Sequence, residues 1–257
     1  MTQSRFVLIG YGTIGKVIAR GVGSVADVAL SAIVSRRPLD AETIPAGAEV
    51  HTDLASTLHD AQLVVEAATP DFVVREGERI LTTADFLPLS LTALADDALR
   101  ARLIETARRY GTTLFVPHGA VLGLDGLFDG RELIDEVNVT TIKHPRNLGL
   151  NEDRNGPMFE GSAREACARF PRNVNVHAAI ALAGIGFDRT ISRIVSDTST
   201  TVMRHEIRVL GDGIDWQITV ASRAASGVSG QYTPVSALGS VTRALLQRRR
   251  FGGMAIV

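Results

Sequence analysis

The first half of the chain alternates short apolar runs with amphipathic stretches. Apolar runs of strand length fall at 5–9, 28–34, 62–68, 86–91 and 113–116. Three stretches between them repeat apolar residues every three or four positions, as a helix with one buried face does; they are 14–22, 71–84 and 96–110. Strands that alternate with helices predict a parallel sheet with right-handed crossovers.

The pattern changes after Pro117. Strand-like alternation covers 136–142, 190–196, 202–210 and 214–221, and helical patterns cover 161–169, 176–182 and 234–247. Three consecutive strands without a strong helix between them predict an antiparallel or mixed sheet. We therefore expect an α/β protein with a doubly wound parallel-sheet domain over 1–117 and a smaller α+β domain with a mixed sheet over 118–232. We expect the C-terminal part, 233–257, to form a helix that packs back on the first domain.

Composition narrows the range of functions. The 257 residues carry a net charge of −1, and no long block has one sign, which argues against nucleic-acid binding. The basic run Arg248–Arg250 suits a solvated helix end. Cys167 is the only cysteine, so no intramolecular disulfide is expected, and the six histidines show no metal-ligand spacing. The N-terminus lacks a signal-peptide pattern, and no apolar run reaches about 18 residues. We expect a cytoplasmic protein without a membrane partner.

A glycine-rich motif follows the first predicted strand and opens the first predicted helix. It reads Gly10-Tyr11-Gly12-Thr13-Ile14-Gly15, a G-x-G-x-x-G. In this context Gly10 permits a tight turn, Gly12 lets the backbone approach a diphosphate, and Gly15 allows close packing of helix on strand. The helix N-terminus offers free N–H groups to the phosphates. The motif predicts a Rossmann domain that binds a dinucleotide.

The end of the second predicted strand bears on the choice between NAD and NADP. A carboxylate there would bind the ribose 2′-hydroxyl of NAD. The sequence instead reads Ser35-Arg36-Arg37, and guanidinium groups suit a 2′-phosphate. We expect the cofactor to be NADP or NAD, with NADP favoured.

Segments along nearly the whole chain resemble the L-aspartate dehydrogenase family. They follow the family's order and read YGTIG, LSLTALADDAL, FVPHGAVLGLD, TTIKHP, FEGSAREACARFPRNVNV, RHEI and TPVSALGSVTRALL. The FPRNVNV segment and the Gly-Leu-Asp loop are the most specific, and the glycine motif is the least.

The resemblance implies roles for three residues: Ala120 would contact the nicotinamide, Asn175 would contact the cofactor, and His205 would be catalytic. It also implies a mixed-sheet domain that forms a homodimer. The family interconverts L-aspartate with oxaloacetate and ammonia through iminoaspartate, which feeds NAD biosynthesis. The cofactor carries the hydride, and a histidine suits the proton transfers near neutral pH.

A dicarboxylate substrate requires cations or hydrogen-bond donors. By charge and position the candidates are His118, Lys143, with its neighbour His144, and Asn173, which could instead cap the helix that follows it. Asp125 could only fix its loop, and Glu66 receives no role.

Four positions depart from the family. His118 replaces a usual serine, Met203 an asparagine and Thr92 a common glycine, and Thr233-Pro234 lies in an altered segment. Two alternatives therefore stay open. One is an NADP-linked dehydrogenase or imine reductase acting on a different small amino or keto acid. The other is a non-catalytic protein that senses NADP.

Overall fold

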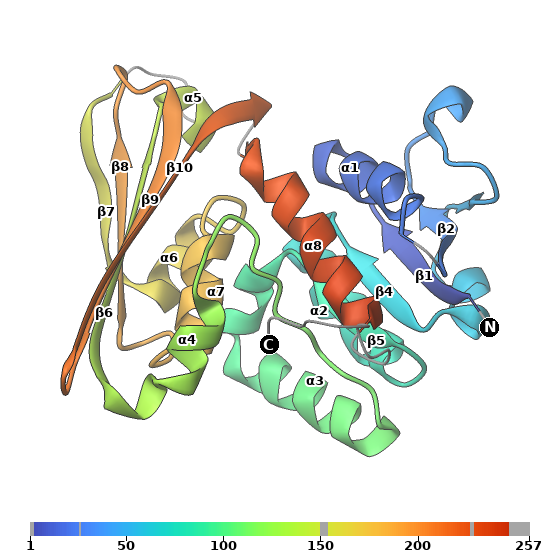
Figure 1. Ribbon diagram of the computed structural model, residues 1–257, viewed down its shortest axis with the longest axis horizontal. Helices are drawn as coiled ribbons and strands as arrows, with labels where there is room; N and C mark the ends of the chain where they lie inside the picture. Colours follow the sequence, from blue (N-terminus) through green and yellow to red (C-terminus); the bar gives the residue numbers. More distant parts are fainter. Residues whose placement is uncertain (1–2, 26, 150–153, 227–228, 247–257) are drawn as a thin grey trace.

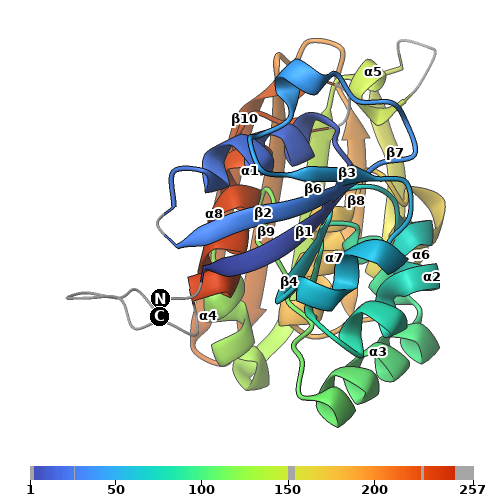
Figure 2. The same cartoon turned by 90° about the vertical axis from the view of Figure 1, so that its right-hand side faces the viewer.

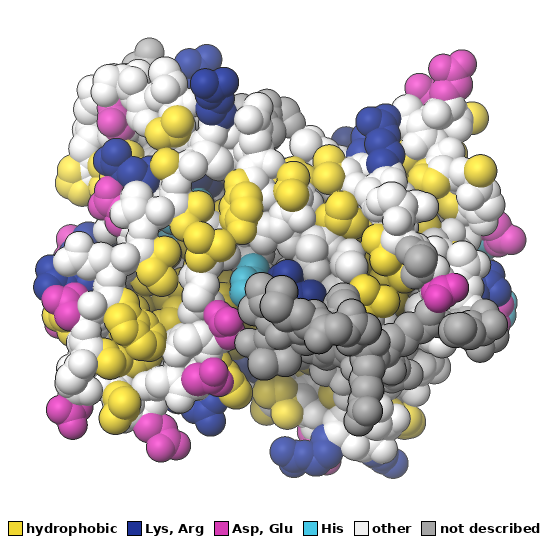
Figure 3. All heavy atoms as spheres, in the orientation of Figure 1, with side chains coloured by type: hydrophobic (Ala, Val, Ile, Leu, Met, Phe, Trp, Pro, Cys, Tyr) yellow, Lys and Arg dark blue, Asp and Glu magenta, His cyan; other side chains and the backbone are white. Residues whose placement is uncertain are grey.

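The computed structural model describes residues 3–25, 27–149, 154–226 and 229–246, so the basic run at 248–250 lies outside the described residues. Two lobes, each built on a sheet, lie side by side, and helix α8 crosses between them (Figure 1). The space-filling view shows a notch between the lobes at its upper edge (Figure 3). In the part of the chain that is described, no helix combines the length and the apolarity that crossing a membrane requires.

The first lobe contains a parallel sheet in the order β3-β2-β1-β4-β5. Its strands are β1 (Ser4–Ile9), β2 (Val28–Val34), β3 (Glu49–His51), β4 (Leu63–Glu66) and β5 (Asp85–Pro88). Alternate residues of β1 enter different cores: Phe6 and Leu8 face α1 (Thr13–Val22), whereas Val7 faces the side of α2 (Pro70–Leu81) and α3 (Asp97–Tyr110). The alternation with a two-residue period therefore gives the helix–sheet–helix layers seen in Figure 2.

Three expectations for this lobe are wrong in detail. The strand expected at 86–91 ends at Pro88, and the chain then forms a 3-10 helix, η3 (Leu91–Ala95). The strand expected at 113–116 is reduced to a single bridge between Phe86 and Leu114, because the chain leaves the sheet toward Pro117. The helix expected at 71–84 ends at Leu81. Strand β3 was not expected, since its three residues are too short to show a pattern.

The second lobe contains a mixed sheet in the order β11-β10-β9-β6-β8-β7. Its strands are β6 (Ile134–Lys143), β7 (Gly156–Ser162), β8 (Thr190–Ser196), β9 (Val202–Gly211), β10 (Ile214–Ser226) and β11 (Ser229–Gly230). Strand β6 runs parallel to β8 and antiparallel to β9. One face is covered by α4 (Leu124–Asp129), α6 (Ala163–Arg169) and α7 (Asn175–Ala183) (Figure 1). The short helix α5 (Pro145–Leu148) follows β6.

The helix expected at 161–169 begins later, at Ala163. Gly161 and Ser162 belong to β7, which the sequence pattern did not reveal. Ser162 caps the helix: its hydroxyl accepts from the Glu165 N–H, and the Glu165 carboxylate accepts from the Ser162 N–H. This capping box fixes the start of α6.

Helix α8 (Tyr232–Leu246) returns to the first lobe and packs against α1. Ala237 and Val241 enter the same core as Phe6 and Leu8, and Gly21 leaves the space that the Leu238 side chain fills.

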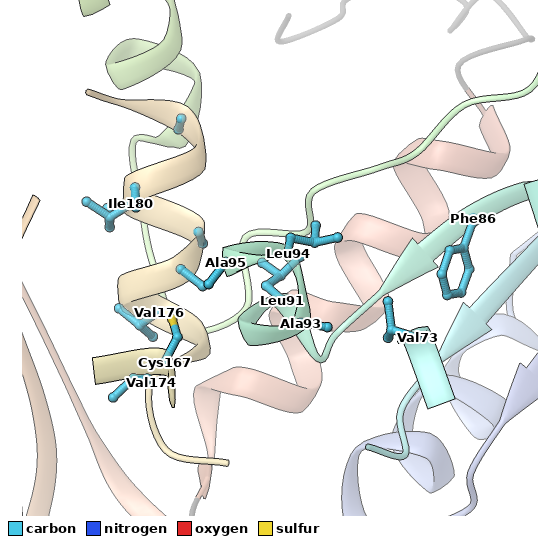
Figure 4. Close-up of a cluster of buried hydrophobic side chains, with 14 of the residues drawn as sticks. Val73, Phe86, Leu91, Ala93, Leu94, Ala95, Cys167, Val174, Val176 and Ile180 are labelled. Atoms are coloured by element: carbon cyan, nitrogen blue, oxygen red, sulfur yellow. The ribbon is translucent and has the colours of Figure 1, made fainter. Parts of the chain in front are cut away.

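A second core spans both lobes. Leu91, Leu94 and Ala95 of η3 lie between Val73 and Phe86 on one side and Val176 and Ile180 of α7 on the other (Figure 4). Arg164 of α6 adds polar contacts across the same boundary, donating to the Ala95 carbonyl and pairing with Asp97 at 3.0 Å and with Asp188 of its own lobe at 2.6 Å. The two sheets are thus held in a fixed relation, and the site lies where they meet.

Candidate active site

The glycine-rich loop has the geometry that a dinucleotide requires. Gly10 has a φ of +88°, and a Cβ on it would lie 2.6 Å from the Ala67 carbonyl oxygen. A Cβ on Gly15 would lie 2.3 Å from the Gly10 carbonyl oxygen, so both positions need glycine for packing. Gly12 instead faces open space at the N-terminus of α1, with nothing within 4 Å of an added Cβ. The N-terminus of α1, which begins at Thr13, therefore borders a space that a diphosphate can enter.

A long groove runs from this loop past the end of β2. Ser35, Arg36 and Arg37 line it, and the Ser35 hydroxyl donates to the Arg37 carbonyl at 2.9 Å, which bends the chain there. Both arginines are exposed. Asp40 and Asp53 line the same groove from elements outside β2, so the nearby sequence gave no sign of them. The groove thus offers cations for a 2′-phosphate together with two carboxylates.

An inner pocket continues from the groove. Ala67, Ala68 and Arg172 line both cavities, so a ligand can extend from one into the other. The pocket brings together the six residues expected at the nicotinamide and the substrate, together with Ile14 of the glycine motif. These six residues are His118, Ala120, Lys143, Asn173, Asn175 and His205. They come from the loop before α4, from β6, from the segment that leads into α7 and from β9.

Two titratable side chains lie on the inner face of the mixed sheet at the pocket. Lys143 is 3% exposed at the end of β6, and His205 is 6% exposed on the neighbouring β9. Burial lowers the pKa of the Lys143 ammonium to about 8. Burial and, secondarily, the Lys143 charge lower the pKa of His205 to about 3. A cation and a neutral imidazole are therefore side by side at neutral pH.

The loop that carries Ala120 is held by helix α8. The His118 N–H donates to the Ser240 hydroxyl at 3.3 Å, and Gly119 adopts a φ of +59°. Ala120 itself is buried. Burial, followed by the charge of Arg243, lowers the pKa of His118, and Asp125 opposes the effect. His118 is thus a neutral group at the pocket wall, and Asp125 acts on it only at long range.

The amides of Asn173 and Asn175, at the start of α7, have different hydrogen-bond partners. Asn175 Oδ1 accepts from the Thr92 N–H at 3.2 Å, which joins α7 to η3. Asn173 does not cap the helix, since the N-cap is Val174 without a side-chain bond. Its Nδ2 donates to the Leu148 carbonyl at 3.4 Å, while its Oδ1 is buried with no hydrogen-bond partner among the described residues. A buried acceptor at the pocket suits a ligand N–H.

Glu66 lies at the end of β4 and is fully buried. Its carboxylate accepts from the Ala68 N–H at 2.6 Å and from the N–H and hydroxyl of Ser90 at 3.0 and 2.9 Å. Burial raises the pKa of this carboxyl, while the hydrogen bonds oppose the change. Glu66 has a structural role, because it holds the loops at Ala68 and Ser90, which line the pocket. His144 caps α5 through its Nδ1 and does not line the pocket.

Sequence reasoning missed three polar residues here. Arg172 of the FPRNVNV segment lines the pocket, whereas Thr141 of β6 and His177 of the apolar helix α7 lie behind it. The available signal for His177 was a lone polar residue among apolar helix residues, and for Thr141 it was a hydroxyl that continues the two-residue alternation of Val137 and Val139. No group of three metal-ligating side chains occurs within the described residues.

Comparisons with known proteins identify the relatives of this chain. Residues 10–117 match the family model described as homoserine dehydrogenase, NAD binding domain, and residues 127–244 match aspartate dehydrogenase, C-terminal. The chain is 38% identical over 192 residues to L-aspartate dehydrogenase 1 of Bordetella pertussis, covering 72% of this chain and 73% of the relative. It is 34% identical over 217 residues to L-aspartate dehydrogenase of Archaeoglobus fulgidus, covering 84% and 86%.

Among solved structures, aspartate dehydrogenase from Thermotoga maritima matches with a TM-score of 0.79 and 26% identity, over 98% of this chain and all of that one. The fold and the site define a dehydrogenase with a Rossmann domain for a nicotinamide dinucleotide and a mixed-sheet domain that supplies side chains. The chain belongs to the L-aspartate dehydrogenase family, whose members are oxidoreductases that act on CH–NH₂ groups.

Proposed function

We propose that the protein is an NAD(P)-dependent L-aspartate dehydrogenase. The reaction converts L-aspartate, water and the oxidised cofactor into oxaloacetate, ammonia, the reduced cofactor and a proton, with iminoaspartate between the two steps. The observation that carries the proposal is that Lys143 and His205 both line a pocket that opens into the dinucleotide groove. The names of the relatives support the substrate.

The first lobe would hold the cofactor and the second would hold the substrate. Gly10, Gly12, Thr13, Ile14 and Gly15 would form the diphosphate and nicotinamide wall, and Ser35, Arg36 and Arg37 would face the adenosine ribose. Ala120 and Asn175 would border the nicotinamide from the opposite side. The division into domains at 1–117, 118–232 and 233–257 is part of the same proposal, although the core shows the lobes are packed together rather than independent.

The residues of the pocket suit a dicarboxylate amino acid. Lys143 supplies a positive charge for a carboxylate in a site where burial strengthens the attraction. Asn173 Oδ1 supplies an acceptor for an N–H of the substrate, and His118 faces the substrate as a neutral donor or acceptor. When bound, nicotinamide supplies the acceptor for the hydride that leaves Cα.

His205 would transfer the protons in the hydrolysis of iminoaspartate. In the free protein its imidazole is neutral, so it can accept a proton from the water that adds to the C=N bond of iminoaspartate. The same proton is then available to the nitrogen that departs as ammonia. A carboxylate bound beside Lys143 offsets the smaller of the two causes that lower the pKa of His205, the larger being burial, so we expect substrate binding to raise this pKa.

The proposal is tested by mixing the protein with NADPH, oxaloacetate and ammonium and following the absorbance of the reduced cofactor. We expect oxidation that requires ammonium, and a parallel series with NADH gives the cofactor preference. Oxidation without any ammonium requirement would instead identify a keto-acid reductase. Tight NADPH binding without turnover on any keto acid would identify a binding protein.

A second candidate is a dehydrogenase for a different small amino or keto acid. Three of the positions that depart from the family, His118, Met203 and Thr233, line the pocket. A panel containing pyruvate, glyoxylate and 2-oxoglutarate, each with ammonium, separates the candidates. If another acid is preferred, His118→Ser, which restores the usual family residue, should shift the preference toward oxaloacetate.

We also propose that the protein forms a homodimer through the outer face of the mixed sheet. No described helix covers this face, and its shallow depression is lined by alternating outward residues such as Asn138, Thr140 and Glu206. Sedimentation equilibrium gives the mass in solution, and a monomer at micromolar concentration would contradict the proposal.

A further inference from the structure

A chain of buried polar side chains runs from His205 away from the pocket. His205 Nδ1 lies 2.8 Å from the Thr141 hydroxyl, which lies 2.6 Å from His177 Nε2. His177 Nδ1 lies 2.8 Å from the Ser192 hydroxyl. The four side chains come from β9, β6, α7 and β8, and all are buried.

The register of the mixed sheet creates this arrangement. Thr141 of β6 is the direct partner of His205 on β9 and, on the inner face, follows the apolar residues Val137 and Val139. The inner face therefore changes from apolar to polar toward the pocket. His177 is fully buried within α7, so it can meet its hydrogen-bonding requirement only through neighbouring protein groups.

The hydroxyl of Thr141 carries a single hydrogen and stands between two imidazole nitrogens. It can donate to one of them, and the other must then carry a hydrogen and donate to the hydroxyl oxygen. Both rings are neutral, because burial is the main cause that lowers the pKa of each. A neutral imidazole has one N–H and one acceptor nitrogen, so the tautomers of His205 and His177 are coupled through Thr141.

We propose that Thr141, His177 and Ser192 are positioning residues that fix the tautomer of His205. In this arrangement His205 Nδ1–H donates to Thr141, Thr141 O–H donates to His177 Nε2, and His177 Nδ1–H donates to Ser192. The remaining nitrogen of His205, Nε2, then keeps its lone pair for the pocket. The catalytic consequence rests on the proposed function, whereas the tautomers themselves do not.

The tautomers are measured directly by ¹⁵N NMR of protein labelled at histidine, in the absence of substrate. Spectra of His205→Asn and His177→Asn assign the two rings among the six histidines. We expect His205 to be protonated at Nδ1 alone, and His177 at Nδ1 alone, near neutral pH. Protonation of His205 at Nε2, or fast exchange between its two tautomers, would overturn the proposal whatever the activity shows.

Variants at Thr141 separate positioning from folding. Thr141→Val keeps the shape without the hydroxyl, and Thr141→Ser keeps the hydroxyl. We expect Thr141→Val to give His205 a mixture of tautomers and a kcat at least several-fold lower, and we expect Thr141→Ser to restore both. A His205 tautomer that is unchanged in folded Thr141→Val would overturn the proposal.

Ser192→Ala provides a second route if Thr141→Val fails to fold. It removes the far partner of His177 but leaves the contact between His205 and Thr141 intact. We expect the His177 signals to show mixed tautomers and those of His205 to follow them. A change confined to His177 would overturn the coupling. If the tautomers behave as expected but no variant alters kcat, the proposal on the tautomers is supported and the proposed catalytic role of His205 is contradicted.

Discussion

The two halves of the site are made from different parts of the polypeptide. In the first lobe the ligand would face main chain, in a loop where Gly10 and Gly15 are packed against backbone and Gly12 borders open space. In the second lobe the ligand would face side chains, Lys143 of β6 and His205 of β9, which lie 62 residues apart in the sequence and line the same pocket. The first site is local in sequence, and the second depends on the register of a sheet.

The two halves of the site should therefore respond differently to substitution. The half that is lined by main chain should lose its function when a side chain is added at a glycine, because the added methyl group would clash with the ligand or with neighbouring backbone atoms. The half that is lined by side chains should lose its function when a functional group is removed, although the shape of the pocket is kept. Substitutions in the two halves should therefore separate cofactor binding from chemistry.

The largest effect is expected from His205→Ala. Removing a general acid–base group lowers kcat by about 10²–10⁴-fold. The cofactor affinity should stay unchanged, because the glycine-rich loop is in the other lobe. Steady-state kinetics and NADPH titration by fluorescence measure the two quantities. His59→Ala, at an exposed histidine outside the pocket, is the matched control and should behave as the wild type. Equal losses in both quantities would mean that His205 supports the fold.

The next largest effect concerns two glycines. Gly12→Ala places a methyl group in open space, so we expect an unchanged melting temperature and a cofactor affinity lower by on the order of 100-fold, as lost hydrogen bonds to a charged group cost about 1.5–3 kcal/mol each. Gly15→Ala places it 2.3 Å from a backbone oxygen, so we expect a loss of stability of about 1–3 kcal/mol. Calorimetry and NADPH titration check both. Normal cofactor binding by Gly12→Ala would move the diphosphate away from this loop.

The same contrast explains what sequence reasoning could predict. The confirmed α/β architecture, and strands such as β2 and β8, follow from periodicities that are local. The glycine motif is also local, and it lies where it was expected. The two-residue alternation also predicted β6 and β9, at 136–142 and 202–210.

Register, however, is a property of two strands, and no single stretch contains it. The pairing of Thr141 with His205 and the approach of His177 from α7 therefore could not be predicted. Short elements such as β3 and α5 have too few residues to show a period. The strand expected at 113–116 has a strand-like composition but leaves the sheet, because the chain must cross to the second lobe after Pro117.

A smaller effect, which depends on pH, is expected from Lys143. Its pKa of about 8 means that raising the pH through 8 removes the positive charge from the pocket. The affinity for succinate, an unreactive dicarboxylate, should fall by about tenfold per pH unit well above pH 8. His205, His177 and His118 have lowered pKa values and stay neutral throughout this range, so they do not contribute.

Two variants sharpen this test. Lys143→Arg keeps its charge, since arginine stays protonated throughout this range, so its succinate affinity should not change between about pH 7 and 9.5. Lys143→Met should bind weakly at every pH. Isothermal titration in the presence of the cofactor measures the three profiles. A wild-type profile that is flat across pH 8 would show that Lys143 is not the group that binds the carboxylate.

The smallest effect is expected at the adenosine end of the groove, where the first lobe also uses side chains. Arg36→Ala and Arg37→Ala together should weaken NADPH by about tenfold, because both residues are exposed and exposed ion pairs are each worth only about 0.2–1 kcal/mol. NADH affinity should stay unchanged, since it lacks the 2′-phosphate. Arg108→Ala, an exposed arginine on α3 outside the groove, controls for a loss of general charge. An equal loss of affinity for NADPH and NADH would indicate that the arginines contact the part that the two dinucleotides share. A preference of the wild type for NADH would instead indicate that Asp40 or Asp53 binds the ribose.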